Sequence, residues 1–310
     1  MTDKYTHIGE VIAYLRKKKG LSQAALAENI CSREYLGKIE KGYQYPTSAV
    51  INELCEKLGI DIYEEYSLIL RHGGFDRHNM ITELNDSFSK EKILNLPSLI
   101  TKCEKNFPQI DGELFQNLCY AKAIYALDIE HNPSLAQDFA LQGILYSHPN
   151  YSLDAPLTNY TLSNIELLLI YYYINSLCEY NSKTNAVLSY LHLYQYLKER
   201  INTNQYIVHK KHHFEINLLS TVVVNMTLYH RNLIPYETLY KLVNDTIELK
   251  KQLDYSNSIT NLLFEKCYLC KKLGYLDEYE KTLNTAKVVG EFYLGKESSE
   301  KLVQWLNQKD

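Results

Sequence analysis

Residues 21–42 read LSQAALAENICSREYLGKIEKG, and this stretch decides the fold of the N-terminal part of the chain. Ser22 and Ser32 are each suited to cap a short helix, and apolar residues follow each cap at helical spacing. Between the two helices, Asn29 tolerates the left-handed backbone that a tight turn often needs. Two short helices packed across such a turn form a helix-turn-helix.

The second of these helices has a polar outward face. A helix of this size fits the major groove of DNA, where its first turn meets base edges. We expect Arg33 to read guanine with its bidentate fork, and Lys38 and Gln23 to reach phosphates. The candidate DNA-binding residues are Gln23, Ser32, Arg33, Glu34, Tyr35 and Lys38. The alternative for an isolated helix is a face that is merely solvated.

Residues 5–70 resemble the helix-turn-helix domain of phage-repressor-type regulators, the XRE or lambda-repressor-like group. The matching residues are L-S-Q at 21–23, L-A at 26–27, S-R at 32–33 and K-I-E-K-G at 38–42, followed by Pro46 and a fourth apolar helix. The resemblance implies a five-helix domain over residues 1–71. It also implies a structural ion pair between Arg16 and Glu40, which we assign to stability rather than to DNA contact.

The turn itself, with Ile30, Cys31 and Ser32 after Asn29, is a variant of the family pattern. It resembles the turn of the Rgg/PlcR-like (RRNPP) peptide-pheromone regulators of Gram-positive bacteria.

Charge is distributed unevenly along the 310 residues, which are enough for about two domains. Residues 1–45 hold eight Lys or Arg and five acidic residues, so they carry a charge of +3. The rest of the chain carries −7, which gives the net charge of −4. A modestly positive head on an acidic body suits a protein in which only the head meets DNA.

The seven cysteines are scattered, and no secretory signal peptide precedes them, so we expect reduced thiols in the cytoplasm. Cys267 and Cys270 form a C-x-x-C without a second pair or a nearby histidine, so we expect no metal site and no cofactor. The longest apolar run, residues 167–174, is far shorter than the about 20 residues that cross a bilayer. No glycine-rich phosphate loop, H-E-x-x-H or nucleophile elbow occurs, so we do not expect an enzyme.

A break in the helical pattern at residues 71–76, with paired glycines, predicts a linker at 72–79 and a second domain over 80–310. The predicted helices there span about 78–88, 90–106, 112–130, 134–147, 160–179, 183–201, 204–231, 235–254, 257–273, 276–290 and 292–308. Paired helices with short turns indicate an all-α fold ending in an α-solenoid. The spacing of Leu263, Cys267, Gly274, Leu283 and Ala286 resembles a tetratricopeptide repeat. We expect the last helix to cap the stack with Phe292, Leu302, Trp305 and Leu306.

Polar residues recur every four positions along the apolar segment 204–231: His213, Asn217, Thr221 and Asn225. Spacing of four places them on one helix face, and a polar row on so apolar a helix must meet water, a neighbouring helix or a ligand. An asparagine amide both donates and accepts, so it can clamp the backbone of an extended peptide. The candidates that extend the row are Tyr171, Asn175 and Asn261, with Lys210 as a partner for a carboxylate. A row of hydrogen bonds between helices, without a ligand, is the alternative.

The architecture as a whole, an XRE head followed by a helical-repeat body, resembles the RRNPP regulators. The resemblance implies a homodimer that binds a double-stranded DNA operator and a short signalling peptide, as in quorum sensing. Two alternatives stay open: a ligand-independent repressor of the phage or mobile-element type, and a repeat-domain adaptor for a protein partner.

Overall fold

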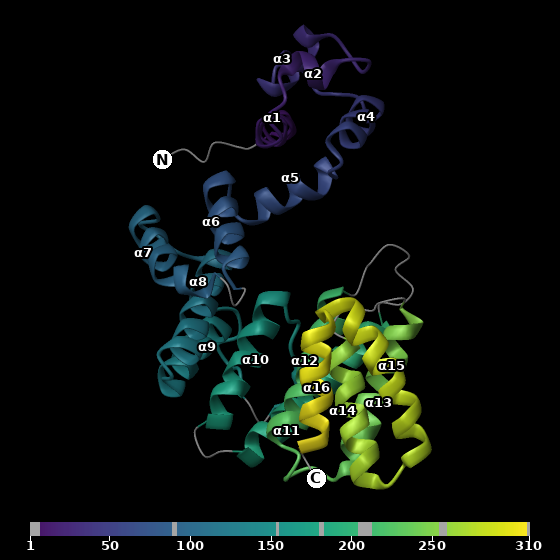
Figure 1. Ribbon diagram of the computed structural model, residues 1–310. Helices are drawn as coiled ribbons and strands as arrows, with labels where there is room; N and C mark the ends of the chain where they lie inside the picture. The colour runs from purple at the N-terminus through teal and green to yellow at the C-terminus, as the bar shows by residue number, and fades with distance from the viewer. Residues whose placement is uncertain are drawn as a thin grey trace. The chain divides into compact units, whose positions relative to one another are not determined.

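The computed structural model describes residues 7–88, 92–152, 155–179, 183–203, 213–253 and 259–308. Within these ranges every regular element is a helix, which confirms the predicted all-α class (Figure 1). The earlier elements are α1 (Ile8–Lys18), α2 (Gln23–Ala27), α3 (Arg33–Glu40), α4 (Ser48–Leu58), α5 (Ile62–Arg71), α6 (Phe75–Asp86), the 3-10 helix η1 (Ile93–Asn95), α7 (Leu96–Asn106) and α8 (Gly112–Ile124). They are followed by the π-helix η2 (Tyr125–Ile129), α9 (Pro133–Ser147), the 3-10 helix η3 (Leu157–Asn159), α10 (Asn164–Glu179), α11 (Lys183–Thr203), α12 (His213–Tyr229), α13 (Tyr236–Gln252), α14 (Ile259–Leu273), α15 (Leu276–Leu294) and α16 (Lys296–Gln308).

The chain forms two compact units, Met1–Ala121 and Lys122–Asp310. In the first unit, helices α1–α5 enclose one apolar core, to which each helix contributes fully buried side chains such as Ile12, Leu26, Leu36, Leu54 and Ile62. Burial of an apolar side chain at each such position contributes about 2 kcal/mol of stability. This burial holds the short helices α2 and α3, which would not be stable alone.

Local signals set the ends of α2 and α3. The Ser22 hydroxyl accepts a hydrogen bond from the main-chain N–H of Ala25 at 3.0 Å, and Ser32 accepts from Tyr35 at 3.1 Å. Asn29, in the turn between them, has φ 64°. Asparagine adopts this left-handed conformation more readily than most residues, so the turn needs no glycine.

Helix α6 begins at Phe75, three residues before the predicted start at 78. Gly73 and Gly74 have φ of 80° and 112°, and the main-chain N–H of His78 bonds to the carbonyl of Gly74, which starts the helix immediately after the glycines. Within the predicted linker 72–79, only residues 72–74 therefore lie outside a helix. The assignment of DNA binding and ligand binding to either side of this linker stays a prediction.

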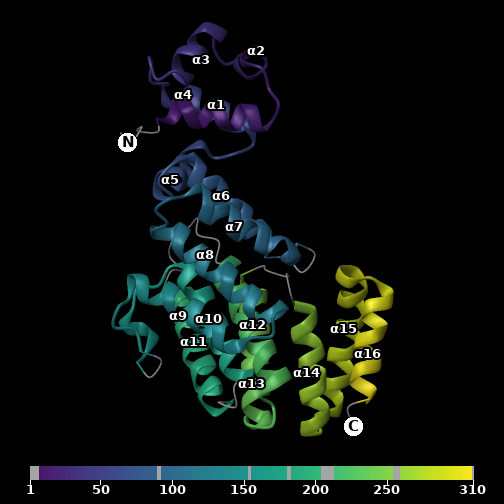
Figure 2. The same ribbon diagram turned by 90° about the vertical axis from the view of Figure 1, so that its left-hand side faces the viewer.

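In the second unit, each helix from α9 to α16 packs on the next one along the chain. Helix α12 also packs on α14, and α14 packs on α16, so these three alternate helices lie side by side (Figures 1 and 2). This is the arrangement of a helical repeat. In the α14–α15 pair, Cys267 and Ala286 are fully buried, and Gly274 turns the chain with φ 75°. The specific assignment to tetratricopeptide repeats stays a prediction.

Helix α12 is described from His213, and residues 204–212 of the predicted helix, with Lys210, lie outside the described residues. The predicted boundary between the last two helices differs from the structure. Helix α15 continues to Leu294, because the break falls at Gly295, where φ is 79°. Phe292 was therefore wrongly predicted to cap the stack from the last helix: it lies on α15 and is 79% exposed.

Candidate DNA interface and ligand surface

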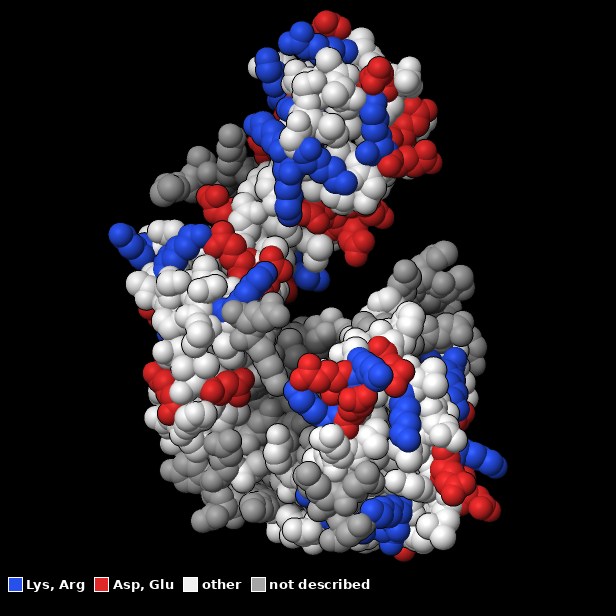
Figure 3. Space-filling model, in the orientation of Figure 1, with Lys and Arg blue, Asp and Glu red and all other residues white. Residues whose placement is uncertain are grey.

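Helix α3 carries the candidate DNA-reading face, and its apolar side determines which face points outward. Leu36 and Ile39 are buried in the core of the first unit. On the opposite side, Ser32, Arg33, Glu34 and Lys38 are exposed, and Tyr35 is half-buried. Figure 3 shows basic side chains among the N-terminal helices, interspersed with acidic ones. The helix thus presents the predicted residues of α3 together at the surface.

A buried ion pair fixes α3 to α1. The Nε and Nη2 atoms of Arg16 donate to the two carboxylate oxygens of Glu40 at 2.6 and 2.9 Å, and Nη1 donates to the carbonyl of Leu21 at 2.8 Å. The hydrogen bond to Glu40 is the main cause that raises the pKa of Arg16. Gln23 donates its amide to Glu40 at 2.7 Å. Glu40 thus binds the side-chain amide of Gln23, which we predicted to reach a phosphate.

Sequence reasoning missed two tyrosines in the loop after α3. Tyr43 and Tyr45 are 79% and 81% exposed, and the hydroxyl of Tyr35 lies 3.5 Å from the carbonyl of Tyr45. Gly42, with φ 75°, turns the chain into this loop. The only signal in the sequence is the presence of two large aromatic residues, Tyr43 and Tyr45, in the short polar segment that follows α3. Their place beside α3 makes them candidates for DNA contact.

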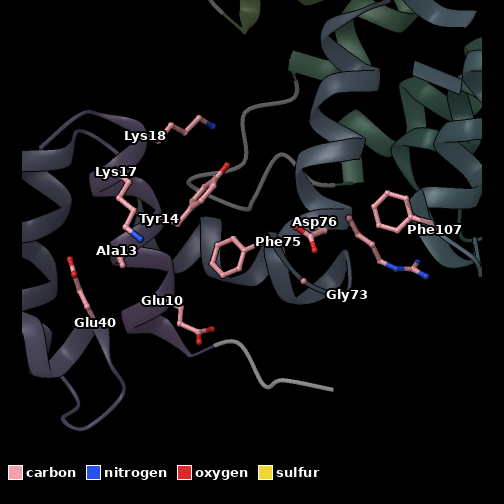
Figure 4. A pocket seen from close by; sticks show the side chains of 12 residues that line it. Glu10, Ala13, Tyr14, Lys17, Lys18, Glu40, Gly73, Phe75, Asp76 and Phe107 are labelled. Carbon is pink, nitrogen blue, oxygen red and sulfur yellow. The ribbon is translucent and has the colours of Figure 1, made fainter. Parts of the chain in front are cut away.

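A cavity of about 980 Å³ lies between α1 and α6 (Figure 4). The rings of Tyr14 and Phe75 meet there with centroids 5.0 Å apart, and the Tyr14 hydroxyl donates to Asn79 at 2.7 Å. The charged residues of the lining are Glu10, Lys17, Lys18, Glu40, Asp76 and Arg77. Because both signs of charge are mixed, the lining favours no class of ligand.

Three of the predicted ligand residues meet where α10 and α12 lie together. The side-chain amide of Asn225 donates to the Tyr171 hydroxyl at 2.8 Å and to the side-chain Oδ1 of Asn175 at 3.4 Å. Tyr190 of α11, which sequence reasoning missed because it looks like any core aromatic, also donates to Asn175. Burial raises the pKa of Tyr171 and of Tyr190, so both hydroxyls remain neutral donors. We name these four residues the amide cluster.

The other predicted ligand residues lie apart from this cluster. His213 and Thr221 are exposed, Asn217 is half-buried, and the Thr221 hydroxyl donates to the carbonyl of Asn217 at 3.0 Å. Asn261 is exposed on α14, beside a second cavity of about 460 Å³. That cavity is formed by α12, α14, α15 and α16, and its apolar lining includes Leu228 and Trp305. The predicted ligand residues therefore do not form one row: Asn225 lies in the amide cluster, and Asn261 lies at the second cavity.

Within the described ranges, no group of three or more His, Cys, Asp or Glu side chains is placed to hold a metal ion. No helix in those ranges combines the length and the apolar character required to span a membrane.

The fold and the exposed α3 define the class of the N-terminal part. Residues 12–64 match the helix-turn-helix family, so this segment is a helix-turn-helix domain of the XRE type. No curated protein sequence matches the chain.

Solved structures resemble the chain over nearly its whole length. PlcR of Bacillus thuringiensis, in complex with the peptide PapR7 and DNA, is 18% identical with a TM-score of 0.59, over 96% of this chain and 98% of that chain. A candidate transcriptional regulator from Listeria monocytogenes EGD-e is 14% identical with a TM-score of 0.52, over 97% of this chain and 96% of that one. At these identities the likeness shows the fold: a helix-turn-helix domain followed by a helical domain, as in PlcR.

Proposed function

We propose that the protein is a DNA-binding transcription regulator whose helical C-terminal part binds a short signalling peptide, and that the peptide controls operator binding. The observation that carries the DNA-binding step is the exposed polar face of α3, held in place by the buried Arg16–Glu40 pair. Such a face can enter the major groove while the rest of the domain stays outside it.

On DNA, Arg33 would read a guanine and Lys38 would contact a phosphate. Ser32, Glu34 and Tyr35 lie on or beside the same turn of α3, and Tyr43 and Tyr45 extend the surface into the following loop. Gln23 would reach a phosphate only after a rearrangement that frees its amide from Glu40.

The peptide-binding step is supported by the overall likeness to PlcR and by the amide cluster. Asn175 and Asn225 are half-buried, so their amides are partly open to a ligand while Tyr171 and Tyr190 hold them in place. A peptide backbone would exchange hydrogen bonds with these amides. His213, Asn217, Thr221 and Asn261 remain proposed ligand residues apart from the cluster, and so does Lys210, which lies outside the described residues.

The regulator would act as a homodimer. Two helix-turn-helix domains would then contact two half-sites, arranged as a palindrome or as a direct repeat. A peptide that binds one dimer geometry more tightly than another would change the spacing of the two domains, and therefore their affinity for the operator.

Genome-wide capture of DNA bound to the protein, with and without conditioned medium from a dense culture, tests this proposal. We expect a few enriched sites whose occupancy depends on the medium, and Asn225→Ala should lose that dependence while Asn284→Ala, an exposed control on α15, keeps it. Occupancy that ignores the medium would instead indicate a ligand-independent repressor. A complete lack of enriched sites would favour an adaptor.

A further inference from the structure

A thiol and an imidazole meet beside the amide cluster. The Sγ atom of Cys178, in the last turn of α10, lies 3.1 Å from Nε2 of His230, which directly follows α12. Cys178 is half-buried, whereas His230 is only 1% exposed. The pair is thus positioned by two helix ends, and Cys178 is the more exposed of the two residues.

The thiol also contacts the amide cluster. Its Sγ lies 3.9 Å from the hydroxyl of Tyr190, which donates to Asn175, and 3.3 Å from the carbonyl of Ile174. Helices α10, α11 and α12 lie side by side at this point (Figures 1 and 2). An atom added to the sulfur would therefore alter a group in contact with the hydroxyl that bonds to Asn175.

The arrangement suits a cysteine that loses its proton as it attacks. The C-terminal ends of α10 and α12 carry partial negative charge, which favours the imidazolium that forms once His230 has accepted the proton. An adjacent histidine that takes the proton is the usual activator of a cysteine nucleophile.

The other cysteines provide a contrast. Burial raises the pKa of Cys267 to about 12 and of Cys270 to about 11, which suppresses their nucleophilic forms. Cys31 is half-buried like Cys178, and burial raises the pKa of the Cys31 thiol, so Cys31 serves as an internal reference.

We propose that Cys178 is a modification site for hydroperoxides and other small soft electrophiles, with His230 as the base, and that its oxidation blocks ligand binding at the amide cluster. With hydrogen peroxide, the sulfur attacks one oxygen as its proton passes to His230. The O–O bond breaks, and the departing hydroxide takes the proton from the imidazolium to leave as water. The products are a sulfenic acid on Cys178 and one water molecule. The effect on ligand binding rests on the proposed function, but the chemical reactivity does not.

The chemical reactivity is tested on the full chain with iodoacetamide, with the alkylation of each cysteine followed by mass spectrometry from about pH 6 to about pH 9. We expect Cys178 to react at least about tenfold faster than Cys31 at about pH 7, with a rate that persists below the ordinary thiol pKa of about 8.5. His230→Gln should reduce the Cys178 rate to about that of Cys31 and leave Cys31 unchanged. Equal rates for the two cysteines in the wild-type protein would overturn the proposal, whether or not the variant folds.

The regulatory consequence is tested with hydrogen peroxide, using dimedone to trap sulfenic acid. We expect dimedone at Cys178, and loss of the response of DNA binding to conditioned medium in the oxidised wild type but not in oxidised Cys178→Ser. A labelled protein that keeps its response would overturn the link to ligand binding. A protein that shows no response even before oxidation would instead refute the proposed function, so the two failures are distinguishable.

Discussion

Replacing Arg16 with alanine should destabilise the helix-turn-helix domain far more than it changes base preference. The Arg16 and Glu40 side chains are only 10% and 6% exposed, so the substitution leaves a carboxylate buried with Gln23 as its remaining partner. Removal of one member of a buried ion pair costs about 3 to 5 kcal/mol, because the other charge loses its compensation. We therefore expect the free energy of unfolding of α1–α4 to fall by about 3 kcal/mol.

Native-state hydrogen exchange at the amides of α1–α4 measures this loss locally. Two controls separate the buried charge from a general effect of substitution. Lys57→Ala removes a hydrogen bond from Nζ to the main-chain carbonyl of Glu28 at 2.8 Å and a longer contact with the Glu28 carboxylate, whose side chain is 71% exposed. It should cost about 1 kcal/mol at most. The double variant Arg16→Met/Glu40→Leu removes both charges and should recover most of the stability. A double variant as unstable as Arg16→Ala, or a loss below about 1 kcal/mol in Arg16→Ala itself, would refute the reasoning.

Three further predictions concern the first unit. Arg33→Ala should weaken operator binding by about 2 kcal/mol and relax the preference at one base position. Lys38→Ala should weaken binding equally for all sequences and reduce the slope of log affinity against log salt concentration by about 1. Fluorescence anisotropy with a series of operator variants measures both effects. Gly9→Ala should lower the melting temperature by several degrees, because the new Cβ would lie 1.8 Å from a main-chain carbonyl oxygen of α3. Gly37→Ala, with no atom nearer than 3.8 Å, should instead raise stability by about 0.5 to 1 kcal/mol; a loss comparable to that of Gly9→Ala would contradict the packing. Burial lowers the pKa of His78 in the folded state, so the unfolded chain binds the proton more tightly and stability should fall as pH drops below about 6.5. The urea midpoint at about pH 7 and about pH 5.5 should differ less in His78→Gln than in the wild type, and an equal difference would exclude this histidine as the cause.

The helix-turn-helix could be predicted from sequence because its signals are local. A serine cap, an asparagine with positive φ and an apolar repeat each act within a few residues, and Ser32 and Asn29 lie in the structure as those signals predict. The amide cluster is different. Tyr190 reaches it from α11 through packing that no nearby residue encodes.

The division of the polar row on α12 has a geometric cause that the spacing already contained. An α-helix turns by about 100° per residue, so each step of four residues overshoots a full turn by about 40°. From His213 to Asn225 there are three such steps, and the row therefore rotates by about 120° around the helix. Asn225, at the end of this rotation, faces Tyr171 and Asn175 on α10, whereas His213, at its start, is exposed. A peptide aligned strictly along α12 could not contact all four side chains. A peptide that crosses from α12 to α10 would meet Asn225 and Asn175 together, and we expect substitutions at these two positions to reduce peptide affinity more than substitutions at His213.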